Sequence, residues 1–100
     1  MAVTLDLTEE ATSHFIQAGD IRMHYNEAGS GEAVICIHGG GPGASGWSNY
    51  NRNIAALSQR FRVLLVDMPG FGKSDAVVIK GESRPEYNAK AFKNFLDALG

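Results

Sequence analysis

The stretch with the clearest chemical potential is a run of glycines at residues 38–47, His-Gly-Gly-Gly-Pro-Gly-Ala-Ser-Gly-Trp. Glycines in series let the backbone adopt conformations closed to other residues, and they leave backbone N–H groups unshielded. Fixed N–H donors can hold the negative charge that develops on a carbonyl oxygen in an acyl-type transition state. A His-Gly-Gly-Gly loop that follows a strand supplies one such donor. The sequence therefore predicts an oxyanion loop here.

This loop lies between a predicted buried strand and a predicted helix. The run 33–37 is apolar at every position, which is typical of a strand covered on both faces. A second apolar strand is predicted over 62–67, and we expect Asp67 at its end to cap the turn that follows. Between the two strands, apolar residues recur at helical steps of three and four. These residues are Trp47, Tyr50, Ile54, Leu57 and Phe61.

The flanking segments complete an α/β pattern. A hairpin is predicted from a short strand at 14–17, a turn at 18–20 and an alternating strand at 21–26. A last helix is predicted to begin at Ser83, which stands three residues before Glu86 as in a capping box. It is predicted to end at Gly100 in a left-handed conformation. Its expected core face consists of Ala91, Phe92, Phe95, Leu96 and Leu99.

The order hairpin, strand, helix, strand, helix predicts one strand–helix–strand unit with a parallel pair of strands.

Composition narrows the range of possible functions further. The chain of 100 residues has a net charge of -2 and scattered basic residues, so nucleic acid is a poor candidate partner. The polar start has no apolar core, so neither a signal peptide nor a membrane anchor is expected, and a cytoplasmic location fits. Cys36 is expected to be buried and inert, and no metal-ligand spacing is present.

The segment HGGGPGASGWSNYNRN, followed by DMPGFGKSD, resembles the meta-cleavage product hydrolases, a branch of the α/β-hydrolase superfamily. The resemblance implies an arm over 1–13 and an incomplete α/β-hydrolase core over 14–100. This core would contain two helices and four strands of a larger, mostly parallel sheet. It also implies hydrolysis of a carbon–carbon bond in 2-hydroxy-6-oxohexa-2,4-dienoates, the ring-opened products of aromatic catabolism. A small-molecule substrate, no cofactor and a homo-oligomer are implied as well.

The same resemblance suggests roles by position. The Gly40 N–H would be an oxyanion donor, and Gly39 and Gly41 would shape the same pocket. The Asn49 side chain would hydrogen-bond the polar dienoate end of the substrate. The catalytic serine, aspartate and histidine would lie beyond Gly100, so residues 1–100 are expected to be inactive alone.

The histidines are expected to be structural. His38 adjoins the glycines, but we expect nearby backbone groups to satisfy its imidazole. His14 and His24 lie in predicted strands. Asp67 is followed by Met-Pro-Gly rather than by a histidine, and no serine has the Gly-x-Ser-x-Gly context of a nucleophile. We therefore expect no catalytic triad within these residues.

Three alternative functions stay open. Gly41, Gly43 and Gly46 satisfy the G-x-G-x-x-G pattern of dinucleotide-binding folds, and Asp67 stands about twenty residues further on. Against this, the first glycine is not at the strand end, and Pro42 removes an N–H where phosphate needs donors. An esterase or haloalkane-cleaving α/β hydrolase is the second alternative, and a non-catalytic relative of these enzymes is the third.

Overall fold

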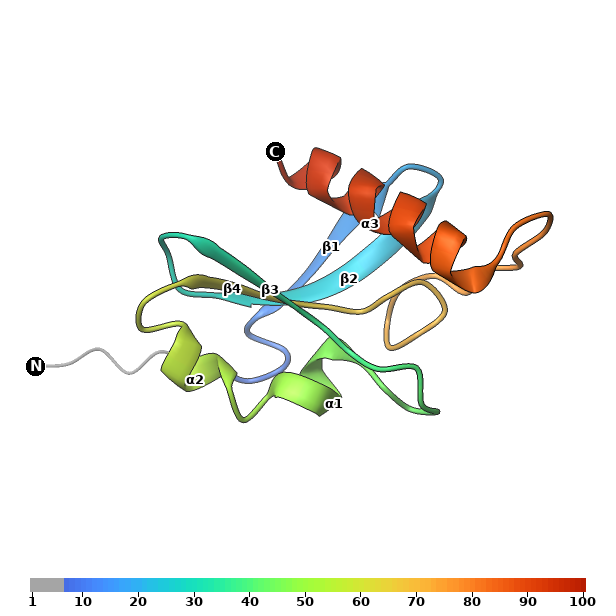
Figure 1. Cartoon of the computed structure of the whole chain (residues 1–100). Coiled ribbons are helices and arrows are strands. Elements are labelled where there is room, and N and C mark those ends of the chain that lie inside the picture. The colour runs from blue at the N-terminus through green and yellow to red at the C-terminus, as the bar shows by residue number, and fades with distance from the viewer. Residues whose placement is uncertain (1–6) are drawn as a thin grey trace, which may run out of the picture.

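The predicted hairpin begins a four-stranded sheet in the computed structural model, which describes residues 7–100 (Figure 1). β1 (Ser13–Ala18) pairs antiparallel with β2 (Ile21–Ala28). β2 also pairs antiparallel with β4 (Arg62–Val66), whereas β3 (Ala33–Ile37) pairs with β4 in parallel. The order across the sheet is β1-β2-β4-β3. The predicted parallel pair of strands is thus confirmed.

The predicted arm over residues 1–13 is only partly among the described residues. Residues 8–12 form a turn that contacts β2 through Asn26. The Asn26 side-chain amide donates to the Glu9 carbonyl oxygen at 2.9 Å and to the Thr12 hydroxyl oxygen at 3.0 Å. Asn26 and Thr12 are both buried. This part of the arm therefore packs on the sheet.

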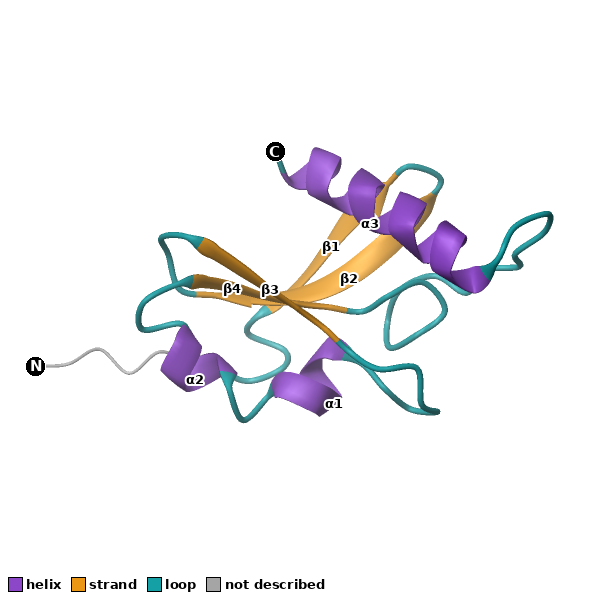
Figure 2. Ribbon diagram, viewed as in Figure 1, coloured by secondary structure: helices purple, strands orange, loops and turns teal. Residues whose placement is uncertain are grey.

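β4 is covered on both faces, as its apolar run predicts. Because side chains alternate along a strand, Leu64 and Val66 pack on the side of α3 (Arg84–Leu99). Val63 and Leu65 pack on the opposite side with a separate cluster. Figure 2 shows α3 on one side of the sheet and the two short helices on the other. β4 therefore joins two small cores.

The apolar stripe after the glycine loop forms two short helices instead of the predicted single one, α1 (Gly46–Tyr50) and α2 (Ile54–Leu57). Between them the side-chain amide of Asn51 donates to the Trp47 carbonyl oxygen at 2.7 Å. Short polar side chains compete in this way with the regular helix ladder. The predicted face is nevertheless correct, because all five residues of the stripe pack in the cluster beneath β4: Trp47, Tyr50, Ile54, Leu57 and Phe61.

α3 begins and ends at the predicted caps. The Glu86 N–H donates to the Ser83 hydroxyl oxygen at 3.3 Å. The Glu86 carboxylate accepts from that hydroxyl, not from the Ser83 backbone, so only half of the predicted capping box forms. Gly100 has a φ of 94° and its N–H donates to the Leu96 carbonyl oxygen. The left-handed C-terminal residue is thus confirmed.

The core face of α3 is narrower than predicted. Ala91 and Phe95 are buried, and Phe92 and Leu99 pack partly against the same cluster. Leu96 is 39% exposed. It lies about 100° further round the helix than Phe95, which turns it away from the sheet. Its inclusion in the core face was wrong.

β3 is less buried than an all-apolar strand predicts. Within residues 7–100 it pairs on one side only, with β4. Ile37 is 43% exposed, and Cys36 is half-buried rather than buried as expected. Burial still raises the pKa of the Cys36 thiol, so the protonated, unreactive form is favoured at neutral pH.

A polypeptide of residues 1–100 expressed by itself is expected to self-associate, because β3 has no second strand partner in the described part of the chain and this edge lies beside exposed Ile37. An Ile37→Lys variant places a charge on that edge and should shift the population toward monomer. Size-exclusion chromatography with light scattering measures the effect. A monomeric wild-type polypeptide with a sharp, cooperative melt would contradict this prediction.

Candidate active site

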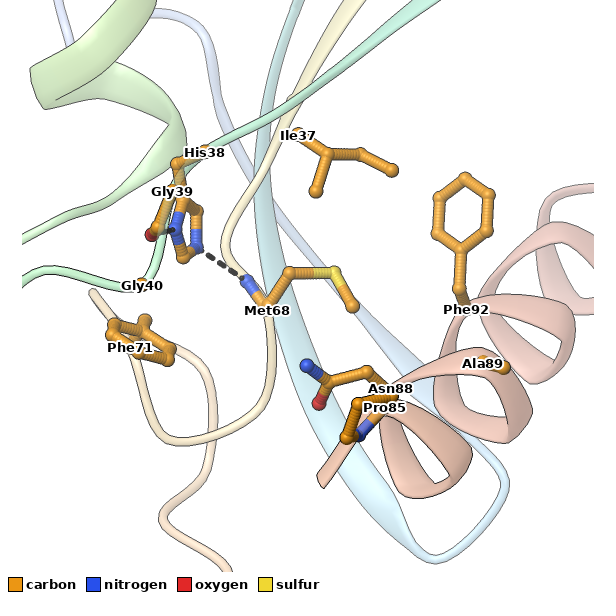
Figure 3. Close-up of a pocket in the computed structure, with 10 residues that line it drawn as sticks. All are labelled: Ile37, His38, Gly39, Gly40, Met68, Phe71, Pro85, Asn88, Ala89 and Phe92. Atoms are coloured by element: carbon orange, nitrogen blue, oxygen red, sulfur yellow. Dashed lines mark hydrogen bonds between the residues drawn. The ribbon is translucent and has the colours of Figure 1, made fainter. Parts of the chain in front are cut away.

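The glycine loop borders a cavity of about 360 Å³ between the end of β3 and α3 (Figure 3). Most of its wall is apolar, and the side chains of His38 and Asn88 add polar groups. Small-molecule sites are typically concave and mostly apolar, with a few polar groups that orient the ligand. The lining residues are Ile37, His38, Gly39, Gly40, Met68, Phe71, Pro85, Asn88, Ala89 and Phe92.

Two of the four predicted site residues meet at this cavity. Gly39 and Gly40 line it, whereas Gly41 and Asn49 are not among its lining residues. Within residues 7–100 the Gly40 N–H donates to no other group. A Cβ atom placed on Gly39, Gly40 or Gly41 would meet no described atom within 4 Å. The loop backbone is therefore unshielded, as its glycines predict.

Asn49 lies on the exposed side of α1. Its side-chain oxygen accepts a hydrogen bond from the Ser48 hydroxyl at 3.2 Å. Ser48 itself completes a capping box with Ser45 that sequence reasoning missed. The signal for that box is a serine three residues after another serine, at the point where the glycines end.

Both ends of the glycine loop are anchored to residues that follow β4. At its start, the Met68 N–H donates to Nε2 of His38 at 3.0 Å, and Nδ1 of His38 lies 2.6 Å from the Gly39 carbonyl oxygen. At its end, the Gly46 N–H donates to Oδ1 of Asp67 at 2.8 Å. The expectation that backbone groups satisfy the His38 imidazole is confirmed.

Asp67 has a histidine partner that chain order did not reveal. Nδ1 of His24 lies 2.9 Å from Oδ2 of Asp67, and Nε2 of His24 lies 2.7 Å from the Ser13 hydroxyl oxygen. A serine–histidine–aspartate hydrogen-bond chain, which the sequence analysis did not predict, is therefore present within these residues. Ser13 does not line the cavity beside Gly40, and only 1% of His24 and 2% of Asp67 are exposed. The chain of hydrogen bonds holds β1, β2 and β4 together.

Asp67 also caps the turn after β4, as predicted. The Lys73 N–H donates to Oδ2 of Asp67 at 3.0 Å, and the Ser74 hydroxyl donates to the Asp67 carbonyl oxygen at 2.6 Å. Burial by itself would raise the pKa of this carboxyl. Hydrogen bonds from His24 and from the Lys73 and Gly46 amides outweigh burial and lower the pKa below its ordinary value of 3.8. The ionised carboxylate is thus the stable form at neutral pH.

Comparison with known proteins identifies the fold family. The family model of the α/β hydrolase fold matches residues 32–100. The chain belongs to this family. Membership agrees with the fold predicted from the glycine loop and its flanking strands. The family match argues against the dinucleotide-binding alternative. Gly46 nevertheless approaches β4 closely, since a Cβ there would lie 2.6 Å from the Leu65 carbonyl carbon.

Relatives of this α/β hydrolase act on dienoates, according to their names. The chain is 54% identical over 95% of its length to 2-hydroxy-6-oxo-6-phenylhexa-2,4-dienoate hydrolase of Comamonas testosteroni, covering 35% of that protein. It is 52% identical over 94% of its length to 2-hydroxy-6-oxononadienedioate/2-hydroxy-6-oxononatrienedioate hydrolase 1 of Dechloromonas aromatica (strain RCB), covering 34% of it. The chain thus spans about a third of the length of the curated relatives that it matches.

A solved structure supports the same grouping. The meta-cleavage product hydrolase CumD from Pseudomonas fluorescens IP01 superposes with a TM-score of 0.79 at 36% identity, covering 86% of this chain and 31% of that one. The resemblance to meta-cleavage product hydrolases is confirmed. Within residues 7–100 no helix is long and apolar enough to cross a bilayer, and no cluster of three or more metal-ligating side chains occurs.

Replacing the anchoring carboxylate should destabilise the fold and change its response to acid. In an Asp67→Asn variant we expect the free energy of unfolding at pH 7 to fall by about 2–4 kcal/mol, because buried donors lose a charged acceptor. Denaturant titration measures this. Asp97→Asn, at an exposed carboxylate on α3, is the matched control and should change little.

The pH dependence follows from the lowered pKa of Asp67. The stabilisation from this carboxylate is fully present above the unfolded-state pKa and is lost as the pH falls through the lower, folded-state pKa. The difference in stability between wild type and Asp67→Asn should therefore shrink below about pH 4. A difference that is constant from pH 7 to pH 2 would show that the carboxylate charge has no such role.

Proposed function

We propose that the complete protein hydrolyses a carbon–carbon bond in 2-hydroxy-6-oxodienoates, the meta-cleavage products of aromatic degradation. The observation that carries this proposal is the Gly40 amide, which has no hydrogen-bond partner among residues 7–100 and lies at the edge of a mostly apolar cavity. The substrates in the names of its relatives supply the chemical class. An apolar cavity suits the aromatic or aliphatic group that such dienoates carry at their keto end.

The chemistry assigns a clear task to this part of the chain. The bound dienol first ketonises, and water then adds across the 6-oxo group, so that its oxygen becomes negatively charged. The Gly40 N–H would hold this oxyanion while the bond between carbons 5 and 6 breaks. Carbon 6 leaves as a carboxylic acid, and carbon 5 takes up a proton. A serine and a histidine from the rest of the protein would drive the addition of water, whether serine attacks directly or activates water.

Removing the Gly40 donor tests the proposal. Proline has no N–H, so Gly40→Pro in the complete protein should lower kcat for a 2-hydroxy-6-oxodienoate by about 10²–10³-fold. Gly40→Ala keeps the N–H, and its Cβ meets no atom of residues 7–100 within 4 Å, so its loss should be much smaller. Loss of dienoate absorbance gives the rate, and a thermal melt verifies folding. Equal losses in the two folded variants would refute the oxyanion role.

Asn49 is proposed to contact the polar dienoate end of the substrate, as the family resemblance implies. Its exposed position on α1 leaves its amide nitrogen available to a ligand. Asn49→Ala should lower kcat/KM for a 2-hydroxy-6-oxodienoate about tenfold or more, because hydrogen bonds to a charged group contribute about 1.5–3 kcal/mol. Turnover of a simple nitrophenyl ester should fall much less. Asn53→Ala, at an exposed asparagine without a side-chain capping bond, is the control. Equal losses on both substrates would argue for a simpler esterase.

We also propose, from the same resemblance, that the complete enzyme is a cytoplasmic homo-oligomer that needs no cofactor. Its partner would be the small-molecule substrate alone. Sedimentation analysis of the purified protein reports the oligomeric state directly.

A further inference from the structure

The structure determines which nitrogen of His38 carries the proton. The group opposite Nε2 is the Met68 backbone N–H, at 3.0 Å, and a backbone N–H can only donate. Nε2 must therefore accept and carry no proton. A neutral imidazole has one proton, which then lies on Nδ1. Nδ1 faces the Gly39 carbonyl oxygen at 2.6 Å, and that oxygen can only accept. Both contacts agree on one neutral tautomer.

The carbonyl that His38 holds belongs to the peptide group of the proposed oxyanion donor. The Gly39 C=O and the Gly40 N–H are the two ends of one planar peptide, and no cis peptide occurs among the described residues. In a trans peptide these two groups point in opposite directions, and rotation about the bond between them is strongly hindered. Fixing the Gly39 oxygen therefore fixes the direction of the Gly40 N–H.

Few other contacts from the described residues restrain this peptide group. The positions of Gly39, Gly40 and Gly41 have open space around them, and the hydrogen bond within the loop lies further on, from the Ala44 N–H to the Gly41 carbonyl oxygen. The His38 ring is itself held in place. It is 8% exposed, and the Phe71 ring packs edge-on against it at 4.9 Å between centroids (Figure 3).

We propose that His38 is a positioning residue for catalysis, which aims the Gly40 N–H and strengthens it as a donor through the Gly39 carbonyl. This inference rests on the proposed oxyanion role of Gly40. Hydrogen bonds in a chain polarise one another, so donation to the Gly39 oxygen makes the N–H at the other end of the peptide a stronger donor. It also removes the freedom that neighbouring glycines would otherwise give the peptide.

Two substitutions in the complete protein separate the two hydrogen bonds of the ring. In His38→Asn the side-chain amide nitrogen can occupy the place of Nδ1 and still donate to the Gly39 oxygen. In His38→Gln the longer side chain can reach the place of Nε2 and accept from the Met68 N–H, but it leaves the Gly39 oxygen without its donor. The variants thus distinguish aiming of the peptide from anchoring of the loop.

The proposal expects kcat for a 2-hydroxy-6-oxodienoate to fall about 10- to 100-fold in His38→Gln with KM within about threefold of wild type, since misplacement of a catalytic group by about 1 Å can have an effect of this size. His38→Asn should recover most of that loss. Equal losses in both variants, or a better rate in His38→Gln, would overturn the positioning role. Melting temperatures verify that both variants fold.

Nitrogen-15 spectroscopy of the His38 ring in the unsubstituted protein is independent of any variant. A protonated Nδ1 and an unprotonated Nε2 are expected for the neutral ring, and the opposite tautomer would overturn the inference. If that tautomer is found but wild type turns over no dienoate, the proposed function fails and the catalytic role falls with it. If wild type is active and the tautomer is the opposite one, only the role of His38 fails.

Discussion

The buried carboxylate of Asp67 is the interaction on which the rest of this structure depends. An ionised group removed from water is tolerated only when donors surround it. Asp67 collects them from three parts of the chain: the His24 ring on β2, the Gly46 amide at the start of α1 and the Lys73 amide in the turn after β4. The same contacts that keep the charge buried fix the glycine loop relative to the sheet.

The glycine loop combines two opposing requirements. In the proposed oxyanion role its amides must be unshielded, which calls for glycine, yet glycine also leaves the backbone free to move. The structure resolves this by anchoring the loop at His38 and at Gly46, on adjacent residues after β4. The part between the anchors needs few contacts of its own. A donor that is already oriented can stabilise charge without reorganising during the reaction.

The cavity beside the loop lies between the sheet and α3. The end of β3 and the turn after β4 form one wall, and α3 forms the other. Three findings point to the same chemistry, because hydrolysis at a 6-oxo group passes through an oxyanion. They are family membership, the dienoate hydrolases among the relatives, and a Gly40 amide without a partner among residues 7–100. This agreement, more than the fold, supports an enzyme over a binding protein, since one fold can host many functions.

The sequence by itself determined the features that depend on neighbouring residues. Apolar alternation, the glycine run and the caps at Ser83 and Gly100 act over a few positions, so strands, loop and helix ends could be predicted from them. Tertiary structure alone decided which distant groups meet. Ser13, His24 and Asp67 are far apart along the chain and come together only through strand pairing. The exposure of Leu96 likewise reflects which surfaces found a partner, and no local pattern encodes that. The break between α1 and α2 is instead a local effect, since the Asn51 side chain bonds to the Trp47 carbonyl oxygen four residues before it.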